Sequence, residues 1–234
     1  MKANDRNTYE IEVLHKSELK LGGFAGIKEH RLVTDTRLFN PNVKRSSWEG
    51  IGQFVYLADA TFVPYGETGD HPHHEVDVIS VIVEGRVAHG GSLEDGEVLS
   101  PPDVQVQRAG GEGFRHNERN PDGEPNRMIQ LWVLPEHSGE RAGYKLYRPE
   151  ENAVTRIYGG DDDQTDTFAS STLIDIVMLD VSEEYELEGS FVGYVTKGKA
   201  EANGVEIEDG HLIRGESLRL RVTEDFQMIL IYES

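Results

Sequence analysis

The sequence Val-Ile-Val-Glu-Gly-Arg-Val-Ala, residues 81–88, has the pattern of two short strands that meet at a glycine flanked by charged residues. Residues 193–202, Gly-Tyr-Val-Thr-Lys-Gly-Lys-Ala-Glu-Ala, repeat this pattern. Turn-forming pairs follow both copies, Pro102-Asp103 after the first and Asp209-Gly210 after the second. A pattern that recurs in this way indicates one β-unit present twice.

Short apolar runs bounded by turn residues surround both copies, and 25 glycines and nine prolines argue against a helical protein. Between residues 199–202 and 205–208, Asn203-Gly204 supplies the two positive-φ residues of a tight hairpin turn. The runs expected to form strands are 53–58, 77–83, 86–89, 104–108, 127–134, 173–179, 191–196, 199–202, 205–208, 218–222 and 227–232. This density of strands predicts an all-β chain built as a sandwich or barrel.

The amino-acid composition indicates which binding partners and which cellular compartment to expect. Against 23 Lys and Arg stand 43 Asp and Glu, which give the 234-residue chain a net charge of −20. So acidic a chain is repelled by phosphate backbones and anionic lipids, so we expect no direct binding to nucleic acid and none to membranes. The chain has no cysteine, residues 1–10 are polar and charged, and no apolar run is long enough to span a bilayer. We therefore expect a cytoplasmic protein whose metal ligands, if any, are His, Asp or Glu.

The repeat also predicts two domains. The stretch between residues 145 and 165 is rich in polar and turn-forming residues, which favours a boundary there. We place the N-terminal, metal-binding domain at residues 1–148 and a C-terminal domain without metal at residues 149–234. The first 25 or so residues give no clear signal and are expected to form an extension that packs on either half.

Histidines concentrate in Asp-His-Pro-His-His-Glu, residues 70–75, immediately before a strong strand. In an extended segment, residues two apart point to the same face, so His71 and His73 present both imidazoles to one point while His74 points away. The same spacing recurs in His116-Asn117-Glu118. Three imidazoles and one carboxylate that converge inside a barrel would form a mononuclear metal site.

A purely structural interpretation stays open on spacing alone. Histidines beside Pro and Asp also occur in exposed loops, and His116 is equally compatible with a solvated turn. His89 is either a barrel-interior residue near the site or an ordinary strand-end side chain. The remaining histidines, His15, His30, His137 and His211, lie in polar or turn segments and are expected at the surface.

At these residues the chain resembles the pirin family of two-domain cupins. The resemblance rests on the order and separation of six short motifs: His71-Pro72-His73, Glu84-Gly85, Ala88-His89, Pro102-Asp103-Val104-Gln105, Ala109-Gly110-Gly111-Glu112-Gly113 and His116-Asn117-Glu118. More weakly, it extends from about residue 35 to the end of the chain. It implies two tandem cupin barrels, that is, double-stranded β-helix or jelly-roll barrels, with metal-site residues at His71, His73, His116 and Glu118.

The resemblance further implies a function. Pirin-like proteins show quercetin 2,3-dioxygenase activity, so we expect a metal-dependent dioxygenase that acts on a small aromatic enol or catechol of the flavonol type together with O₂. The cofactor would be one divalent transition metal, Fe(II) first, with Ni, Mn, Cu or Zn as alternatives. Glu118 would serve as a ligand or as the general base.

Two other functions fit the same ligands. Pirin-like proteins also act as regulatory partners, so the chain is alternatively a non-catalytic, metal- or redox-responsive binding protein with a protein partner. A cupin lyase or isomerase would use the same residues without O₂.

The chain also departs from the family pattern. Residues 74–77, His-Glu-Val-Asp, replace the usual Arg-Gly-Phe-Glu, and Val106 replaces a common aromatic residue, so we expect an altered cavity and entrance. In the second repeat, Glu184 and Glu186 stand where the first has its two histidines. We expect no metal there, although two carboxylates at this spacing also suit a cation.

Overall fold

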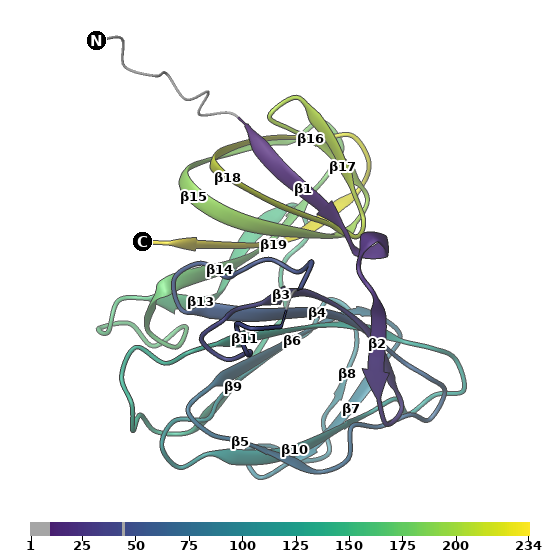
Figure 1. The fold of residues 1–234 in the computed structure, drawn as a ribbon, viewed down its shortest axis with the longest axis vertical. Coiled ribbons are helices and arrows are strands. Elements are labelled where there is room, and N and C mark those ends of the chain that lie inside the picture. Colours follow the sequence, from purple (N-terminus) through teal and green to yellow (C-terminus); the bar gives the residue numbers. More distant parts are fainter. Residues whose placement is uncertain (1–9, 44) are drawn as a thin grey trace.

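The computed structural model describes residues 10–43 and 45–234. Within them the expected all-β fold of two cupin barrels is confirmed, and the one helical element is a short 3₁₀ helix, η1 (Lys16–Glu18) (Figure 1). The first barrel contains β2 (Leu21–Phe24), β3 (Ile27–Thr34), β4 (Phe54–Phe62), β5 (His71–His73), β6 (Asp77–Glu84), β7 (Val87–Gly91), β8 (Val98–Leu99), β9 (Val104–Arg108), β10 (Phe114–Arg119), β11 (Arg127–Val133) and β12 (Gly143–Tyr147). The second contains β1 (Ile11–His15), β13 (Ala153–Gly160), β14 (Ser170–Leu179), β15 (Glu184–Lys197), β16 (Lys199–Ala202), β17 (Val205–Glu208), β18 (His211–Val222) and β19 (Phe226–Glu233).

Two antiparallel sheets enclose the interior of the first barrel. The larger has the order β12-β9-β6-β11-β4-β3-β2, and the smaller has the order β5-β10-β7-β8. In the second barrel one continuous sheet, β13-β14-β19-β15-β18-β16-β17, curls over itself, with β1 added along β18. The smaller sheet of the first barrel lies on the side away from the second barrel (Figure 1).

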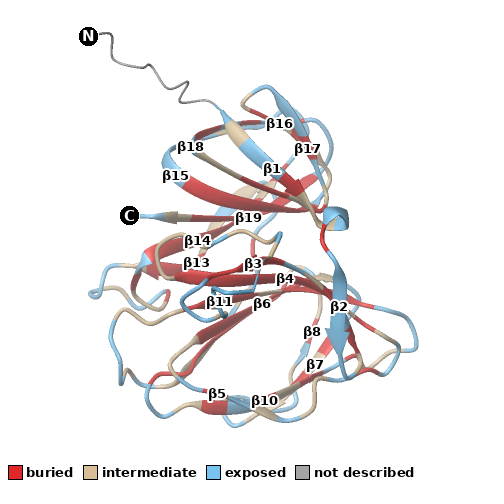
Figure 2. Ribbon diagram, viewed as in Figure 1, coloured by how far each residue is buried: buried red, intermediate tan, exposed pale blue. Residues whose placement is uncertain are grey.

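Successive side chains of a strand point to opposite faces of the sheet, so the larger sheet packs against two different environments. In β9, Val104 and Val106 point to the core shared with the second barrel, whereas Gln105 and Gln107, although fully buried, belong to the opposite face. The shared core also takes Ile79 and Leu131 from the first barrel, and residues such as Ile229 from the second. Figure 2 shows the resulting concentration of buried residues where the barrels meet.

Both glycines of the repeat occupy tight turns. Gly85 has φ 67° and Gly198 has φ 74°, a conformation that favours glycine. The predicted hairpin at Asn203-Gly204 is confirmed as well, because φ is 49° and 82° at these residues and the turn joins β16 to β17.

The N-terminal segment contacts both barrels. Strand β1 pairs with β18 of the second barrel, η1 follows, and β2 then pairs with β3 of the first. Residues 11–15, placed in the first domain on sequence, therefore belong to the sheet of the second barrel. The change from one barrel to the other later in the chain falls between β12 and β13, and the boundary at residue 148 stays a prediction.

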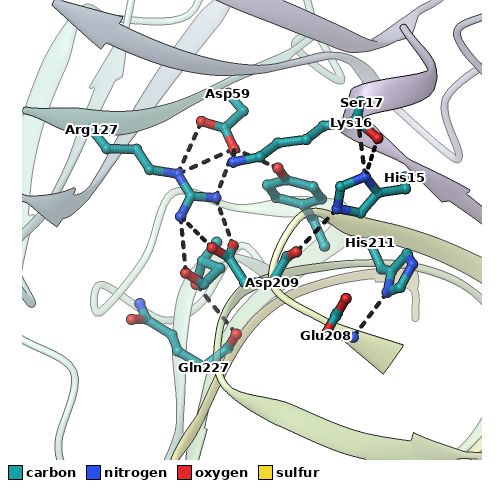
Figure 3. A network of polar contacts seen from close by, with 11 residues as sticks. His15, Lys16, Ser17, Asp59, Arg127, Glu208, Asp209, His211 and Gln227 are labelled. Carbon is teal, nitrogen blue, oxygen red and sulfur yellow. Dashed lines mark hydrogen bonds and ion pairs between the residues drawn. The ribbon is translucent and has the colours of Figure 1, made fainter. Parts of the chain in front are cut away.

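A charged network joins this segment to both barrels (Figure 3). Arg127 on β11 donates to Asp59 on β4 at 2.7 Å and to Asp209, between β17 and β18, at 2.7 Å. Lys16 of η1 donates to the same Asp59 at 2.8 Å. Because Arg127 and Asp59 are buried, the network fixes the two barrels and the N-terminal segment to one another.

Two histidines expected at the surface lie beside this network instead. The rings of His15 and His211 are half-buried, with centroids 4.9 Å apart. They pack together because β1 pairs with β18 in a register that sets His15 opposite His211. His137 is exposed, as expected.

Candidate metal centre

Three histidines meet on the inner face of the smaller sheet. His71 and His73 lie on β5, and His116 lies on the neighbouring β10, paired with His71. His74 is exposed, as the alternation predicts. The interpretation of His116 as a solvated turn is wrong, because this residue lies within β10 and its side chain is fully buried.

The three Nε2 atoms converge. His116 Nε2 is 3.1 Å from His71 Nε2 and 3.2 Å from His73 Nε2. On the far side of its ring, His71 Nδ1 donates to the Gly69 carbonyl oxygen at 2.9 Å, and His116 Nδ1 donates to Gln107 Oε1 at 3.0 Å. An acceptor at Nδ1 fixes the tautomer in which Nε2 keeps its lone pair.

Burial keeps two of these rings neutral. It lowers the pKa of His73 to about 3 and that of His116 to about 3, with a further contribution from the neighbouring imidazoles. At neutral pH both rings therefore keep a nitrogen lone pair that can bind a cation. Neutral imidazole nitrogens suit Fe, Ni, Cu and Zn, so the residues present fit a transition metal.

Glu118, the fourth residue expected at the site, lies on β10 in the same barrel interior but outside the cluster of three imidazoles. Its Oε1 accepts from Ser80 Oγ at 2.8 Å and from Gln105 Nε2 at 3.1 Å, and its Oε2 accepts from Gln130 Nε2 at 3.1 Å. These donors are direct cross-strand neighbours on β9, β6 and β11. Burial raises the pKa of Glu118, and the Ser80 hydrogen bond is the largest opposing effect.

His89 is a barrel-interior residue, which settles the choice left open by the sequence. Its register partner across β7 and β10 is Glu118, and its ring centroid lies 5.6 Å from that of His116. Neither ring nitrogen of His89 has a hydrogen-bond partner among the described residues. Burial lowers its pKa.

A cavity of about 300 Å³ opens onto this centre. His71, His73 and Glu118 line it together with an aromatic wall. In that wall the Tyr56 and Trp132 rings lie 4.4 Å apart, and Phe39 stacks at 5.7 Å from Tyr56. The remaining lining residues are Phe24, Ile27, Glu29, Arg31, Ala60, Thr68, Pro72, Met128 and Gln130.

Asp77 and Val106, two of the positions that depart from the family pattern, lie away from this cavity, so they do not reshape it as expected. Asp77 is fully buried on the opposite face of β6, where it accepts from Tyr158 of the second barrel at 2.7 Å and pairs with Arg108 at 3.2 Å. Val106 belongs to the core between the barrels. Both positions face the second barrel because they alternate with residues that face the interior. Glu184 and Glu186 are exposed on β15, and Glu186 pairs with Arg219.

The fold and the centre together define a class of protein, the two-barrel cupins with an imidazole cluster inside the first barrel. Comparison with known proteins narrows this class. The Pirin family model matches residues 43–133. A putative quercetin 2,3-dioxygenase of Pseudomonas aeruginosa is 31% identical over 174 residues, which cover 69% of this chain and 75% of the relative. The chain belongs to the pirin family.

Further relatives agree with this assignment. A putative quercetin 2,3-dioxygenase of Zymomonas mobilis is 26% identical over 209 residues, covering 83% of this chain and 86% of the relative. Among solved structures, the bacterial pirin YhhW from Escherichia coli, in complex with nickel(II), has a TM-score of 0.81 at 19% identity and covers 95% of this chain and 98% of its own. None of the described helical residues forms a segment long and apolar enough to cross a membrane.

Proposed function

We propose that this chain is a metal-dependent dioxygenase of flavonol-like substrates. The observation that carries the proposal is the convergence of three imidazole Nε2 atoms at a cavity with a wall of packed aromatic rings. Relatives named as putative quercetin 2,3-dioxygenases support the choice of substrate class.

His71, His73 and His116 would hold one divalent transition metal, with Glu118 as a further ligand or as the general base. The nickel complex of the bacterial pirin supports a divalent ion, and Fe(II) remains our first choice among Fe, Ni, Mn, Cu and Zn. When bound, such a metal supplies Lewis-acid and redox chemistry to the substrate oxygen and to O₂. We assign no metal to residues 149–234.

The chain's own residues would orient the substrate and move its proton. Tyr56 and Trp132 provide flat faces for the aromatic rings. Glu118, at the cavity, accepts the proton of the substrate hydroxyl, a role that suits a carboxylate whose pKa is raised by burial. Ser80, Gln105 and Gln130 keep that carboxylate in place through their hydrogen bonds.

Oxygen uptake with a panel of flavonols and catechols, using anaerobically purified, iron-loaded protein, tests the proposal. We expect uptake by the wild type and none by a variant with both His71→Ala and His73→Ala, which should lose the metal and stay folded because two barrel cores remain intact. A wild type that binds metal yet consumes no oxygen with any of these compounds would favour the non-catalytic binding protein. Product formation without oxygen uptake would favour a lyase or isomerase.

A further inference from the structure

A second polar group lies in the same cavity, apart from the imidazoles. Glu29, on β3, is buried with 4% exposure. One of its oxygens, Oε1, accepts from Arg31 Nε at 2.7 Å, and the other, Oε2, accepts from the Tyr56 hydroxyl at 3.1 Å. All three residues line the cavity, and none of them belongs to the metal centre. We call Glu29, Arg31 and Tyr56 the distal cluster.

The sheet order places the distal cluster on β3 and β4 of the larger sheet, whereas the imidazoles lie on β5 and β10 of the smaller sheet. Arg31 pairs with Ala58 and Glu29 pairs with Ala60, while Ala58 pairs in turn with Gln130 of β11. Gln130 donates to Glu118, at the metal end of the cavity. Ala60 of β4, which has a small side chain, lines the cavity between the two sheets, so a flat ligand there would meet polar side chains from both.

The charges of the distal cluster define what it recognises. Arg31 is the only Lys or Arg among the described residues that line the cavity, and 48% of its side chain is exposed. Glu29 compensates this charge from a buried position, so an incoming carboxylate would meet both an attraction and a like charge. A hydroxyl group meets no such conflict, because it can donate to a free lone pair of Glu29 and accept from the Arg31 guanidinium.

We propose that the distal cluster is a recognition site for a hydroxyl group at the end of the aromatic ligand opposite the metal, and that Glu29 excludes ligands with a carboxylate there. The proposal deepens the proposed function, on which it rests for the aromatic nature of the ligand. It makes Glu29 and Arg31 specificity-determining residues that lie on β3, away from the reacting end of the cavity.

Two probes that differ only in the distal group test it. Binding of 2,6-dihydroxynaphthalene and of 6-hydroxy-2-naphthoate is measured by quenching of tryptophan fluorescence under anaerobic conditions, so that no turnover is needed. We expect the wild type to bind the diol about tenfold more tightly, since hydrogen bonds to charged groups are worth a factor of about 10 to 100.

Substitutions of Glu29 and Arg31 should change the ratio of the two affinities, diol over carboxylate, in opposite directions. In Glu29→Gln, Arg31 loses its compensating charge, so the carboxylate probe should become the tighter ligand. In Arg31→Met, the attraction is lost and Glu29 remains, so the ratio should shift further towards the diol. Glu84→Gln is the matched control, because it removes the same charge at an exposed position outside the cavity, and it should keep the wild-type ratio.

A ratio that stays the same in Glu29→Gln and Arg31→Met, or that shifts equally in Glu84→Gln, would overturn the proposal. To confirm that the carboxylate is sensed at the distal end, the Glu29→Gln substitution is also made together with His71→Ala and His73→Ala, where the reversal should persist. Loss of the reversal in that background would place the carboxylate at the imidazoles and would also contradict the proposal. A protein that shows the reversal but no oxygen uptake would retain the recognition site and lose only the dioxygenase assignment.

Discussion

Gln107 and the carbonyl group of Gly69 perform the same task for two different histidines. Each accepts the Nδ1 proton and thereby leaves Nε2 free to face the centre. The amide nitrogen of Gln107 has no partner in the described residues, which is consistent with its oxygen being committed to His116. In other metal sites, removing such a hydrogen-bond acceptor of a ligating histidine lowers the metal affinity by a factor of about 10 to 100.

The variant Gln107→Leu should therefore bind metal about 10 to 100 times more weakly while staying folded. Titration of metal-free protein against a competing chelator measures the affinity. Tyr144→Phe is the control, since the Tyr144 hydroxyl lies in the same barrel interior and has no hydrogen-bond partner among residues 10–43 and 45–234. Equal affinity in wild type and Gln107→Leu would mean that the His116 ring needs no support from Gln107.

Replacing Glu118 by Gln separates its two candidate roles. If Glu118 is the general base, Glu118→Gln should retain metal and lose about 10²- to 10⁴-fold in the rate of oxygen uptake. If it is mainly a ligand, metal content should fall together with the rate. Glu183→Gln, an exposed substitution in the second barrel, controls for the change in charge. A rate within a factor of about two of wild type, with full metal, would remove the base assignment.

The spacing of the histidines predicted the three that meet, but the glutamines around them were not foreseen. Gln105 and Gln107 alternate with valines, and a polar residue in such a pattern usually faces solvent. Only the closure of the barrel turns this face inward. The same closure brings Glu29 and Arg31 to the cavity, and neither residue has a sequence motif that signals it.

At the scale of elements, the hairpin at Gly198 does not tolerate a side chain at the glycine position. A Cβ atom on Gly198 would lie 1.9 Å from the Asp225 carbonyl oxygen, and φ is positive. Gly198→Ala should thus lower the free energy of unfolding by more than the roughly 1 to 3 kcal/mol of backbone strain alone. Urea denaturation measures the loss.

Gly189→Ala, also in the second barrel, is the matched control for this effect. Its φ is 101°, but a Cβ atom there would meet no atom of the described residues within 4 Å, so this variant has the backbone strain without the steric clash. Equal losses in the two variants would contradict the steric argument. Neither variant should change metal content, because the imidazoles lie in the other barrel.

Strands with one apolar face were predicted well, whereas in the smaller sheet only β7 was expected, at residues 86–89, and β5, β8 and β10 were not. The bounds of β9, β16 and β17 agree with the expected ranges, since their alternation is regular. By contrast, β5 is three residues long and β10 reads Phe-Arg-His-Asn-Glu-Arg. The residues that β10 buries are mostly polar, so hydrophobic periodicity gives no signal at the strand that carries the site.

For the whole molecule, the charged network between the two barrels should contribute measurably to the free energy of unfolding. Asp59 is 5% exposed and accepts from Arg127, Lys16 and Tyr194. Asp59→Asn leaves the buried Arg127 poorly compensated, a change that typically costs about 3 to 5 kcal/mol. Asp225→Asn should cost less than about 1 kcal/mol, because its pair with Lys197 is exposed.

The effect of Asp59 should depend on pH. Despite the cost of burial, the hydrogen bonds and charges of Arg127 and Lys16 lower its pKa below the ordinary value of 3.8. A carboxyl group with a lowered pKa in the folded state stabilises the fold above about pH 4 and loses this contribution as the pH falls further. The difference between wild type and Asp59→Asn in urea denaturation should be largest near neutral pH and shrink below about pH 4. A difference that is constant over this range would rule out the charge as its source.

The sequence predicted two barrels, but it did not predict how they are joined. Alternation shows that a strand has a buried face without showing what covers it, and both faces of the larger sheet turned out to be covered. Asp59, Arg127 and Asp209 are far apart in the chain and carry no common motif.

The pairing of β1 with β18 has a consequence for the order in which the protein is made. Ile11 pairs with Gly215, so the first strand must wait during synthesis until nearly all of the described chain has been translated. By then the strands of the first barrel have all left the ribosome, and that barrel can close without it. Among the described residues, 11–15 are thus synthesised early and find their partner late, and their docking completes the second barrel's sheet.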